Sequence, residues 1–378
     1  MTMRSASLDK PWAVLETACP WALQLAPIGG YRPWSAKNVP LPDAFHRRFV
    51  IVSGKGGVGK STLAAAIGLR SAKEGRRTCI VQLNTRDAIG PIFATHGEVG
   101  YQPTRLDPTL PLWSVDLRPG PALREYGVMK LRFRSLHKLV FENDVMRRLL
   151  GMVPGMTETL LLGKAWFMEA IERDESGSLR WDTLIIDAPS TGHGISLLRL
   201  PQVLLSVVPV GPMADDARQM AALLADPART AFHIATLPAE LPVNEALDLE
   251  AHARDLIGIP TGSMLVNQLL DPAGDAASVA QIPPLLKRLD AAEVDAGPMA
   301  AALGDIRHNW QAAERWRDGK GVQLARLEAA TALPIVRLPH LLGRVDRAGL
   351  DRLGDVLANS GTSPGTAAQA VSGVGVSR

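Results

Sequence analysis

The stretch Gly-Lys-Gly-Gly-Val-Gly-Lys-Ser occupies residues 54–61 and decides the fold of this 378-residue chain. It has the composition of a phosphate-binding loop, in which glycines let the backbone turn tightly and aim consecutive N–H groups at phosphate oxygens. In such a loop Lys60 reaches the β- and γ-phosphates, and Ser61 offers its hydroxyl to Mg²⁺. A second lysine, Lys55, stands near the front of the loop. The motif therefore predicts a nucleotide-binding protein.

The sequence on either side of the loop has the order that this motif requires. Residues 48–52 form a run rich in β-branched side chains that predicts a buried strand, and residues 61–67 open a helix whose N-terminal dipole favours an anion. A chance glycine-rich turn would not need strand, loop and helix in this order. The nucleotide is expected to contact the following residues: Gly54, Gly56, Gly57, Val58, Gly59, Lys60, Ser61 and Thr62.

Composition suits a large protein with an α/β core. Hydrophobic residues make up 46% of the chain and charged residues 21%, and the formal net charge of +3 is too small to indicate a nucleic-acid partner. The two cysteines, Cys19 and Cys79, form no C-x-x-C pair, which suits a reducing compartment. Apolar stretches stay shorter than the roughly 18 residues of a membrane span. These features predict a cytoplasmic protein without a membrane span.

Predicted strands and helices alternate along the chain after the loop. This alternation is typical of an α/β fold with a doubly wound, mainly parallel sheet, whose ligand binds beyond the carboxyl ends of the strands. We expect a helical insertion at about residues 120–175 and a second helical stretch at 272–330. Strands are expected at residues 48–53, 78–83, 112–116, 183–187, 203–210, 231–237 and 263–267.

The two ends of the chain differ from this central domain of residues 46–358. Residues 1–45 contain Trp12, Trp21 and Trp34 among prolines and glycines, and we interpret them as an extension that packs along the domain or binds a partner. Residues 359–378 are rich in Ser, Gly, Thr and Ala, which predicts a disordered tail.

A second nucleotide motif follows the predicted strand at residues 183–187. The apolar run of residues 184–186 delivers Asp187 at the strand end, where a carboxylate can join the Mg²⁺ shell. A lone aspartate at a strand end is often only a turn or cap residue. Because a phosphate loop lies upstream, we favour a metal site formed by Ser61 and Asp187.

Three segments together resemble the ArsA family of ATPases: the loop with its doubled lysine, residues 187–193 (Asp-Ala-Pro-Ser-Thr-Gly-His) and residues 197–201 (Leu-Leu-Arg-Leu-Pro). That family includes the arsenite pump ATPase and the ATPase that targets tail-anchored membrane proteins. Softer matches at 236–246, 265–268 and 338–339 extend the resemblance over residues 47–357. It implies a deviant Walker A loop, ATP and Mg²⁺ as cofactors, and a homodimer or a heterodimer with a homologous ATPase that acts on an unknown protein client.

The resemblance also assigns roles to single residues. Lys55 matches the family's signature lysine, which reaches the nucleotide of the other subunit, rather than a solvated loop lysine. Asn267 matches an asparagine that reads the adenine, although a turn cap at a strand end is a serious rival interpretation. The main chain near Leu338 and Pro339 would cover the base.

One position departs from the family pattern. An aspartate after the second strand orients the attacking water in the family, but this chain has Asn84 there. An amide can position water and cannot accept its proton, so Asp87 is a candidate substitute if the loop shifts. The predicted catalytic residues are therefore Lys55, Lys60, Asn84 and Asp87. We expect ATP binding with weak or partner-dependent hydrolysis; the alternative is a nucleotide-gated switch that forms the silent half of a heterodimer.

The insertion is the place to seek a client. Tyr126, Met129, Phe133, Leu136 and Val140 follow 3-4 spacing and predict an amphipathic helix, with several methionines nearby. A helical subdomain packed on itself is the favoured interpretation, because apolar stripes usually form core.

Other functional classes fit less well. Arsenite binding needs clustered thiolates, the eukaryotic tail-anchor ATPase has a C-x-x-C zinc pair, and iron–sulfur reductases need cluster cysteines; two distant cysteines supply none of these. Positioning and partition ATPases need a basic patch or a C-terminal amphipathic helix, which the chain after Leu357 does not supply. His193 could sense the nucleotide or make a structural hydrogen bond with equal plausibility.

Overall fold

A single sheet forms the centre of the computed structural model, which describes residues 43–95, 97–130, 156–269, 284, 287–288, 298–341, 343 and 345–360. The sheet has eight strands in the order β3-β4-β2-β5-β1-β6-β7-β8. All neighbours pair in parallel except β3 and β4, which are antiparallel. This arrangement confirms the predicted α/β fold. The strands are β1 (Phe49–Gly54), β2 (Thr78–Leu83), β3 (Thr104–Arg105), β4 (Leu112–Leu117), β5 (Thr183–Ser190), β6 (Thr230–Thr236), β7 (Thr261–Leu269) and β8 (Ile335–Pro339).

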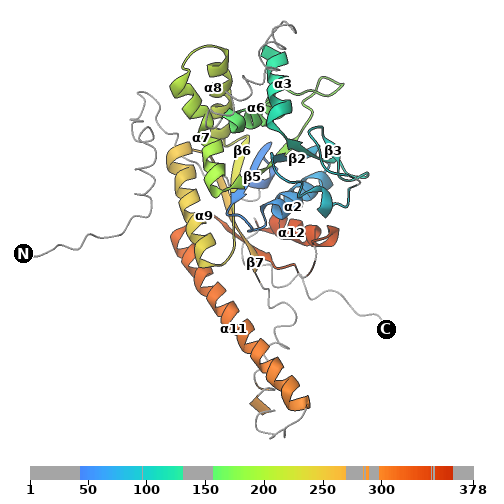
Figure 1. Cartoon of the computed structure of the whole chain (residues 1–378), viewed down its shortest axis with the longest axis vertical. Helices are drawn as coiled ribbons and strands as arrows, with labels where there is room; N and C mark the ends of the chain where they lie inside the picture. Colours follow the sequence, from blue (N-terminus) through green and yellow to red (C-terminus); the bar gives the residue numbers. More distant parts are fainter. Residues whose placement is uncertain are drawn as a thin grey trace, which may run out of the picture.

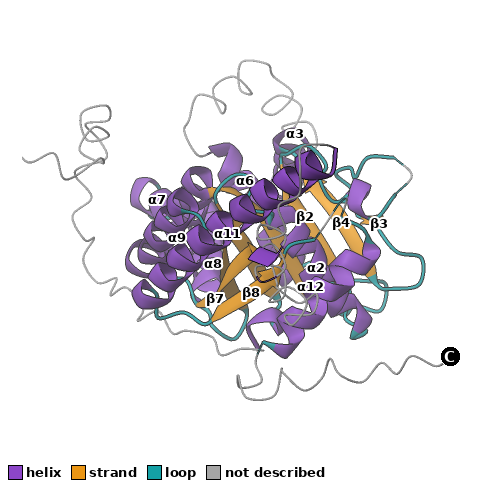
Figure 2. Ribbon diagram, turned by 90° about the horizontal axis from the view of Figure 1, so that it is seen from below, coloured by secondary structure: helices purple, strands orange, loops and turns teal. Residues whose placement is uncertain are grey.

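Helices cover both faces of this sheet (Figure 2). One face carries α2 and α12, and the other carries α6, α7, α8 and α9. A long helix, α11, lies beside α9 and continues beyond the body of the molecule (Figure 1). The helices are α2 (Lys60–Lys73), α3 (Pro119–Lys130), α6 (Met156–Ala170), α7 (Thr191–Val207), α8 (Pro212–Ala225), α9 (Glu240–His252), α11 (Pro298–Ala330) and α12 (Arg347–Asn359), with short helical turns at η1 (Asp43–His46), η2 (Gly90–Ile92) and η3 (Ala253–Ile257).

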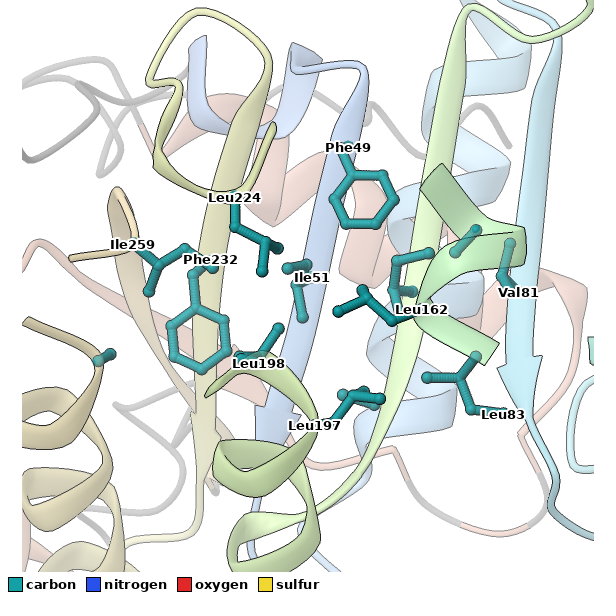
Figure 3. Packing of buried hydrophobic residues seen from close by; sticks show 14 of the residues in the cluster. Phe49, Ile51, Val81, Leu83, Leu162, Leu197, Leu198, Leu224, Phe232 and Ile259 are labelled. Carbon is teal, nitrogen blue, oxygen red and sulfur yellow. The ribbon is translucent and has the colours of Figure 1, made fainter. Parts of the chain in front are cut away.

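The central strand β1 shows why the apolar runs are continuous. Phe49 and Ile51 point into the layer formed with α6 and α7, whereas Val50 and Val52 point into the layer formed with α2 and α12. Figure 3 shows Phe49 and Ile51 among Leu162, Leu197 and Phe232, which come from distant parts of the chain. Each fully buried side chain of this size contributes roughly 1.5–3 kcal/mol to folding stability. Because helices cover both faces of the sheet, side chains on both sides of β1 are buried, and its sequence is apolar without alternation.

The strand predicted at residues 203–210 is wrong. Residues up to Val207 belong to α7, and the chain after it forms the loop that leads to α8. Leu197 and Leu198 face the core, while Val203 and Val207, four residues apart on the helix, are 38% and 74% exposed. An apolar run alone does not separate a helix from a strand, and this one continues the 17-residue helix that begins at Thr191.

The predicted insertion is described only at its two ends. Residues 120–130 lie in α3 and residues 156–170 form α6, whereas residues 131–155, with Phe133, Leu136 and Val140, lie outside the described residues. The α6 helix buries Leu161 and Leu162 in the main core. The Tyr126 hydroxyl of α3 donates to Asp216 Oδ2 of α8 at 3.2 Å. Most of the predicted N-terminal extension and C-terminal tail also lies outside the described residues.

A buried histidine fixes η1 to the sheet. His233 of β6 is fully buried, and its Nε2 donates to the carbonyl oxygen of Ala44 at 3.3 Å, so its Nδ1 accepts from the Ser263 hydroxyl at 2.8 Å. Its ring stacks on Phe45 with 4.5 Å between centroids. Burial lowers the pKa of His233 to about 4, although the hydrogen bond to Ala44 opposes the shift.

This histidine predicts a loss of stability in acid. The unfolded chain takes up a proton near pH 6.5, whereas folded His233 stays neutral down to about pH 4. The contribution of neutral His233 to the free energy of unfolding is therefore complete above pH 6.5. It is lost as the pH drops towards 4, by roughly 3 kcal/mol in all. Urea unfolding at pH 7 and pH 4.5 should show this loss in the wild type and a smaller loss in His233→Asn. Equal losses in the two proteins would refute this role of His233.

Candidate functional site

The phosphate loop of residues 54–61 joins β1 to α2 in the middle of the carboxyl edge of the sheet. Its turn depends on glycines in the left-handed region. Gly54 has φ 152°, and a Cβ there would lie 2.1 Å from the carbonyl oxygen of Ala235 on β6. Gly59 has φ 94°, and a Cβ there would lie 2.3 Å from Nδ2 of Asn267. The loop therefore packs closely against the ends of β6 and β7.

The predicted metal ligands lie in direct contact. The Ser61 hydroxyl donates to Asp187 Oδ2 at 2.6 Å, because β5 pairs with β1 and places Asp187 level with Val52, just before the loop. Asp187 is only 7% exposed. Burial raises the pKa of Asp187, while the hydrogen bond from Ser61 and the charge of Lys60 oppose the shift. The structure thus brings Lys60, Ser61 and Asp187 together.

Both lysines of the loop have partners within the chain. Lys60 Nζ donates to the carbonyl oxygen of Lys55 at 3.0 Å. Burial lowers the pKa of Lys60, and the negative charge of Asp187 opposes this shift. Lys55 Nζ in turn lies 2.5 Å from Oε1 of Glu245 on α9. The contact with Glu245 was not predicted, because no short-range pattern links residues so far apart.

Asn267 at the end of β7 contacts the phosphate loop. Its Nδ2 donates to the carbonyl oxygen of Val58 at 2.9 Å, and its Oδ1 accepts from the backbone N–H of Gln268 at 2.9 Å. Pro339 ends the neighbouring strand β8 and pairs with Leu269. The two residues predicted to contact the base thus lie near the ends of adjacent strands, with Asn267 in contact with the loop, and their roles toward adenine stay predictions.

The two residues predicted to position water lie in different surroundings. Asn84 directly follows β2, is exposed, and has a positive φ of 50°. The Asp87 carboxylate accepts hydrogen bonds from Gln82 Nε2 and from the backbone N–H groups of Ile89, Gly90 and Val99. Burial acts to raise the pKa of Asp87, but these four hydrogen bonds hold it below its ordinary value. The carboxylate thus fixes its own loop, while the Asn84 side chain faces solvent.

Two buried polar residues beside this loop were not predicted. Gln82 is fully buried in β2, level with Asp187 on β5 and with Asp116 on β4. Its Oε1 accepts from the Ala88 N–H at 2.9 Å. Asp116 Oδ2 lies 2.5 Å from Arg118 Nη2, and burial raises the pKa of Asp116 despite that charge. A polar residue inside an otherwise apolar strand was the available signal for both.

Comparison with known proteins agrees with this geometry. Residues 47–211, which contain the phosphate loop and Asp187, match the family model for anion-transporting ATPases, ArsA_ATPase. This match, together with the relatives described next, supports an ArsA-type ATPase domain in this part of the chain. Among its relatives, the ATPase BagA of Mycobacterium tuberculosis is 27% identical over 339 residues, which cover 83% of this chain and 93% of BagA.

Other relatives match this chain over different shares of their own length. The arsenical pump-driving ATPase of Escherichia coli is 27% identical over 248 residues, 61% of this chain and 40% of that protein. The ATPase GET3B of Arabidopsis thaliana is 25% identical over 281 residues, 60% of this chain and 65% of that protein. In the described part of the chain, no helix is both long and apolar enough to cross a membrane.

Proposed function

We propose that this chain is an ArsA-family ATPase that binds ATP with Mg²⁺ on the loop of residues 54–61 and hydrolyses it slowly as a dimer, coupling closure of two subunits to the handling of a protein client. The observation that carries the proposal is the 2.6 Å contact between Ser61 and Asp187 next to Lys60. The second subunit is either another copy of the chain or a homologous ATPase.

The residues of the loop fit a nucleotide and a magnesium ion. A Cβ at Gly56 or Gly57 would meet no other atom within 4 Å, so the outer side of the loop has room for phosphates. Ser61 and Asp187 offer the hard oxygen atoms that Mg²⁺ prefers. Among the described residues there is no group of three or more histidines, cysteines or acidic residues suited to a metal. The ion would thus complete its shell with water and phosphate oxygens, as Mg²⁺ commonly does at nucleotide sites.

The charges around the loop support phosphoryl transfer. Ser61 and Asp187 would hold the Mg²⁺, whose positive charge would offset the negative charge that develops on the phosphate oxygens. Lys60 would exchange the carbonyl oxygen of Lys55 for a phosphate oxygen, while the dipole of α2 favours the same anion. Lys55 of a second subunit would add a cation only when the two subunits close, which couples nucleotide state to dimer geometry.

Base recognition by Asn267 and Pro339 is compatible with the contacts observed. An amide side chain offers two N–H donors and an oxygen with two lone pairs. The hydrogen bonds with Val58 and Gln268 use one N–H donor and one lone pair. The second N–H donor and the second lone pair can therefore form hydrogen bonds with the base edge. The main chain at Pro339, on the adjacent strand end, would lie over the base.

A protein client is what the resemblance to the ArsA family as a whole implies. Val207, the last residue of α7, and Val210, in the loop that follows, are 74% and 75% exposed. Exposed apolar side chains of this kind suit contact with an apolar partner. The described structure contains a free cysteine only at Cys79, which is buried, and burial raises the pKa of its thiol. An arsenite site on that thiol is therefore not supported.

The second candidate function is a nucleotide-gated switch with little hydrolysis, and Asn84 is the observation that favours it. Its amide faces solvent where the resemblance expects a carboxylate, and the carboxylate of Asp87 is engaged by its own loop. Because the transition state for phosphoryl transfer is largely dissociative, an amide that only positions the water can still support slow turnover.

Turnover and binding of ATP with Mg²⁺, measured over a series of protein concentrations, test the proposal. We expect slow turnover that rises more steeply than the protein concentration, and an increase of about tenfold in Asn84→Asp, since a carboxylate can both orient water and accept its proton. Aspartate also tolerates the left-handed backbone at this position. Tight binding without turnover would establish the switch instead, and absence of ATP binding would contradict both functions.

A further inference from the structure

The ion pair between Lys55 and Glu245 crosses from the phosphate loop to a different helix. Lys55 Nζ and Glu245 Oε1 are 2.5 Å apart, and the side chains are 27% and 33% exposed. Since β6 pairs with β1 and ends at Thr236, the first turns of α9 lie beside the loop at the carboxyl edge. The sheet therefore places Glu245 within reach of Lys55 in the same subunit.

Lys55 also holds the second lysine of the loop. Its carbonyl oxygen accepts the hydrogen bond from Lys60 Nζ at 3.0 Å, while its own ammonium group is bound by Glu245. Both cations that the proposed function directs at phosphates are thus held by groups of the same chain. Each contact must be exchanged for a phosphate oxygen before the corresponding lysine can act.

We propose that Glu245 is the positioning residue for Lys55, holding its ammonium group within its own subunit until a second subunit closes and offers a phosphate in exchange. This inference rests on the proposed function, because it requires a dimer that Lys55 crosses. A carboxylate and a phosphate are both anions, so they compete for the one ammonium group. Glu245 therefore opposes closure and makes it depend on the nucleotide of the other subunit.

The residues around Glu245 connect this ion pair to α11. Asn244, the preceding residue, accepts a hydrogen bond from Arg326 of α11. Lys320, on the same helix, donates to the carbonyl oxygen of Gln268 at 2.8 Å, next to the Asn267 that contacts the loop. The long helix is therefore joined to the phosphate loop from two sides, through α9 and through the end of β7. When Lys55 leaves Glu245, the contacts that change adjoin those that hold α11, the helix that continues past the body of the molecule (Figure 1).

The test measures dimer formation by analytical ultracentrifugation, with Mg²⁺ and a non-hydrolysable ATP analogue. In Glu245→Gln the dissociation constant of the homodimer should fall about fivefold, which corresponds to a modest contribution from each of the two partly exposed ion pairs that closure breaks. Glu240→Gln, an exposed residue in the first turn of the same helix, should leave it unchanged. In a Lys55→Ala background, Glu245→Gln should have no effect, because the group that it positions is missing.

Two results would overturn the inference. One is an unchanged dissociation constant in Glu245→Gln, with urea unfolding showing that the variant is folded. The other is an equal effect of Glu245→Gln with and without Lys55, which would indicate general charge repulsion rather than positioning of this lysine. A wild-type protein that binds the analogue and dimerises, but does not respond to Glu245→Gln, refutes only the role of Glu245. A wild type that does not dimerise removes the proposed dimeric function as well.

Discussion

Lys60→Ala is expected to lower ATP turnover at least 100-fold and to weaken ATP binding. The Lys60 ammonium group lies at the start of α2, beside the carboxylate of Asp187 and partly buried, so its charge acts at short range on whatever anion the loop holds. Removal of one group that stabilises a developing negative charge typically costs about 10²–10³ in rate. Steady-state turnover and calorimetric titration with ATP and Mg²⁺ measure the two effects.

The matched control for this substitution is Lys73→Ala. Lys73 lies at the other end of α2, where it pairs with Asp351 of α12 at 2.7 Å. A surface pair of this kind contributes no more than about 1 kcal/mol to stability, so turnover should stay near that of the wild type. If Lys60→Ala retained full turnover, the loop of residues 54–61 would not be the site of ATP hydrolysis.

The positions of the strands could be predicted only in part, and the reason lies in particular segments. The strands β1, β2, β4, β5, β6 and β7 are apolar runs bounded by charged residues or turns, and their positions match the sequence closely. The run after Leu200 is equally apolar and is helical. The strand β8 has five residues after Pro334, too few for periodicity to indicate its conformation.

The site divides in the same way between local and distant contacts. Lys60, Ser61 and Asp187 could be predicted to lie together because a known geometric rule brings the ends of adjacent parallel strands to one edge. The partners of Lys55 and Asn267 lie 190 and 209 residues away in the sequence. Such contacts depend on how α9 and β7 pack beside the loop, and no short motif carries that information.

Glu169→Gln is expected to lower the free energy of unfolding by about 3 kcal/mol, the lower end for a broken buried ion pair. The Glu169 side chain on α6 is only 2% exposed and lies between two arginines. Arg48 Nε donates to Oε1 of Glu169 at 2.9 Å, and Arg48 Nη2 donates to the backbone carbonyl oxygen of Glu169 at 2.9 Å. Arg229 donates to both carboxylate oxygens.

The position of the two arginines explains why this carboxylate matters for the fold. Arg48 and Arg229 directly precede β1 and β6, which pair from Phe49 and Thr230 onward, so Glu169 joins α6 to the amino ends of two neighbouring strands. The arginine side chains are 29% and 35% exposed and can reach water when the carboxylate is lost, which keeps the expected effect near 3 rather than 5 kcal/mol.

Urea unfolding at pH 7 measures this effect, with Glu175→Gln in an exposed turn as the matched control. The control should unfold like the wild type, because substitutions at exposed positions usually change stability by no more than about 0.5 kcal/mol. Equal stability of Glu169→Gln and Glu175→Gln would mean that the two arginines contribute no net stabilisation. The attachment of α6 to the sheet would then depend on apolar packing, through Leu161, Leu162 and Trp166 in the layer shared with β1.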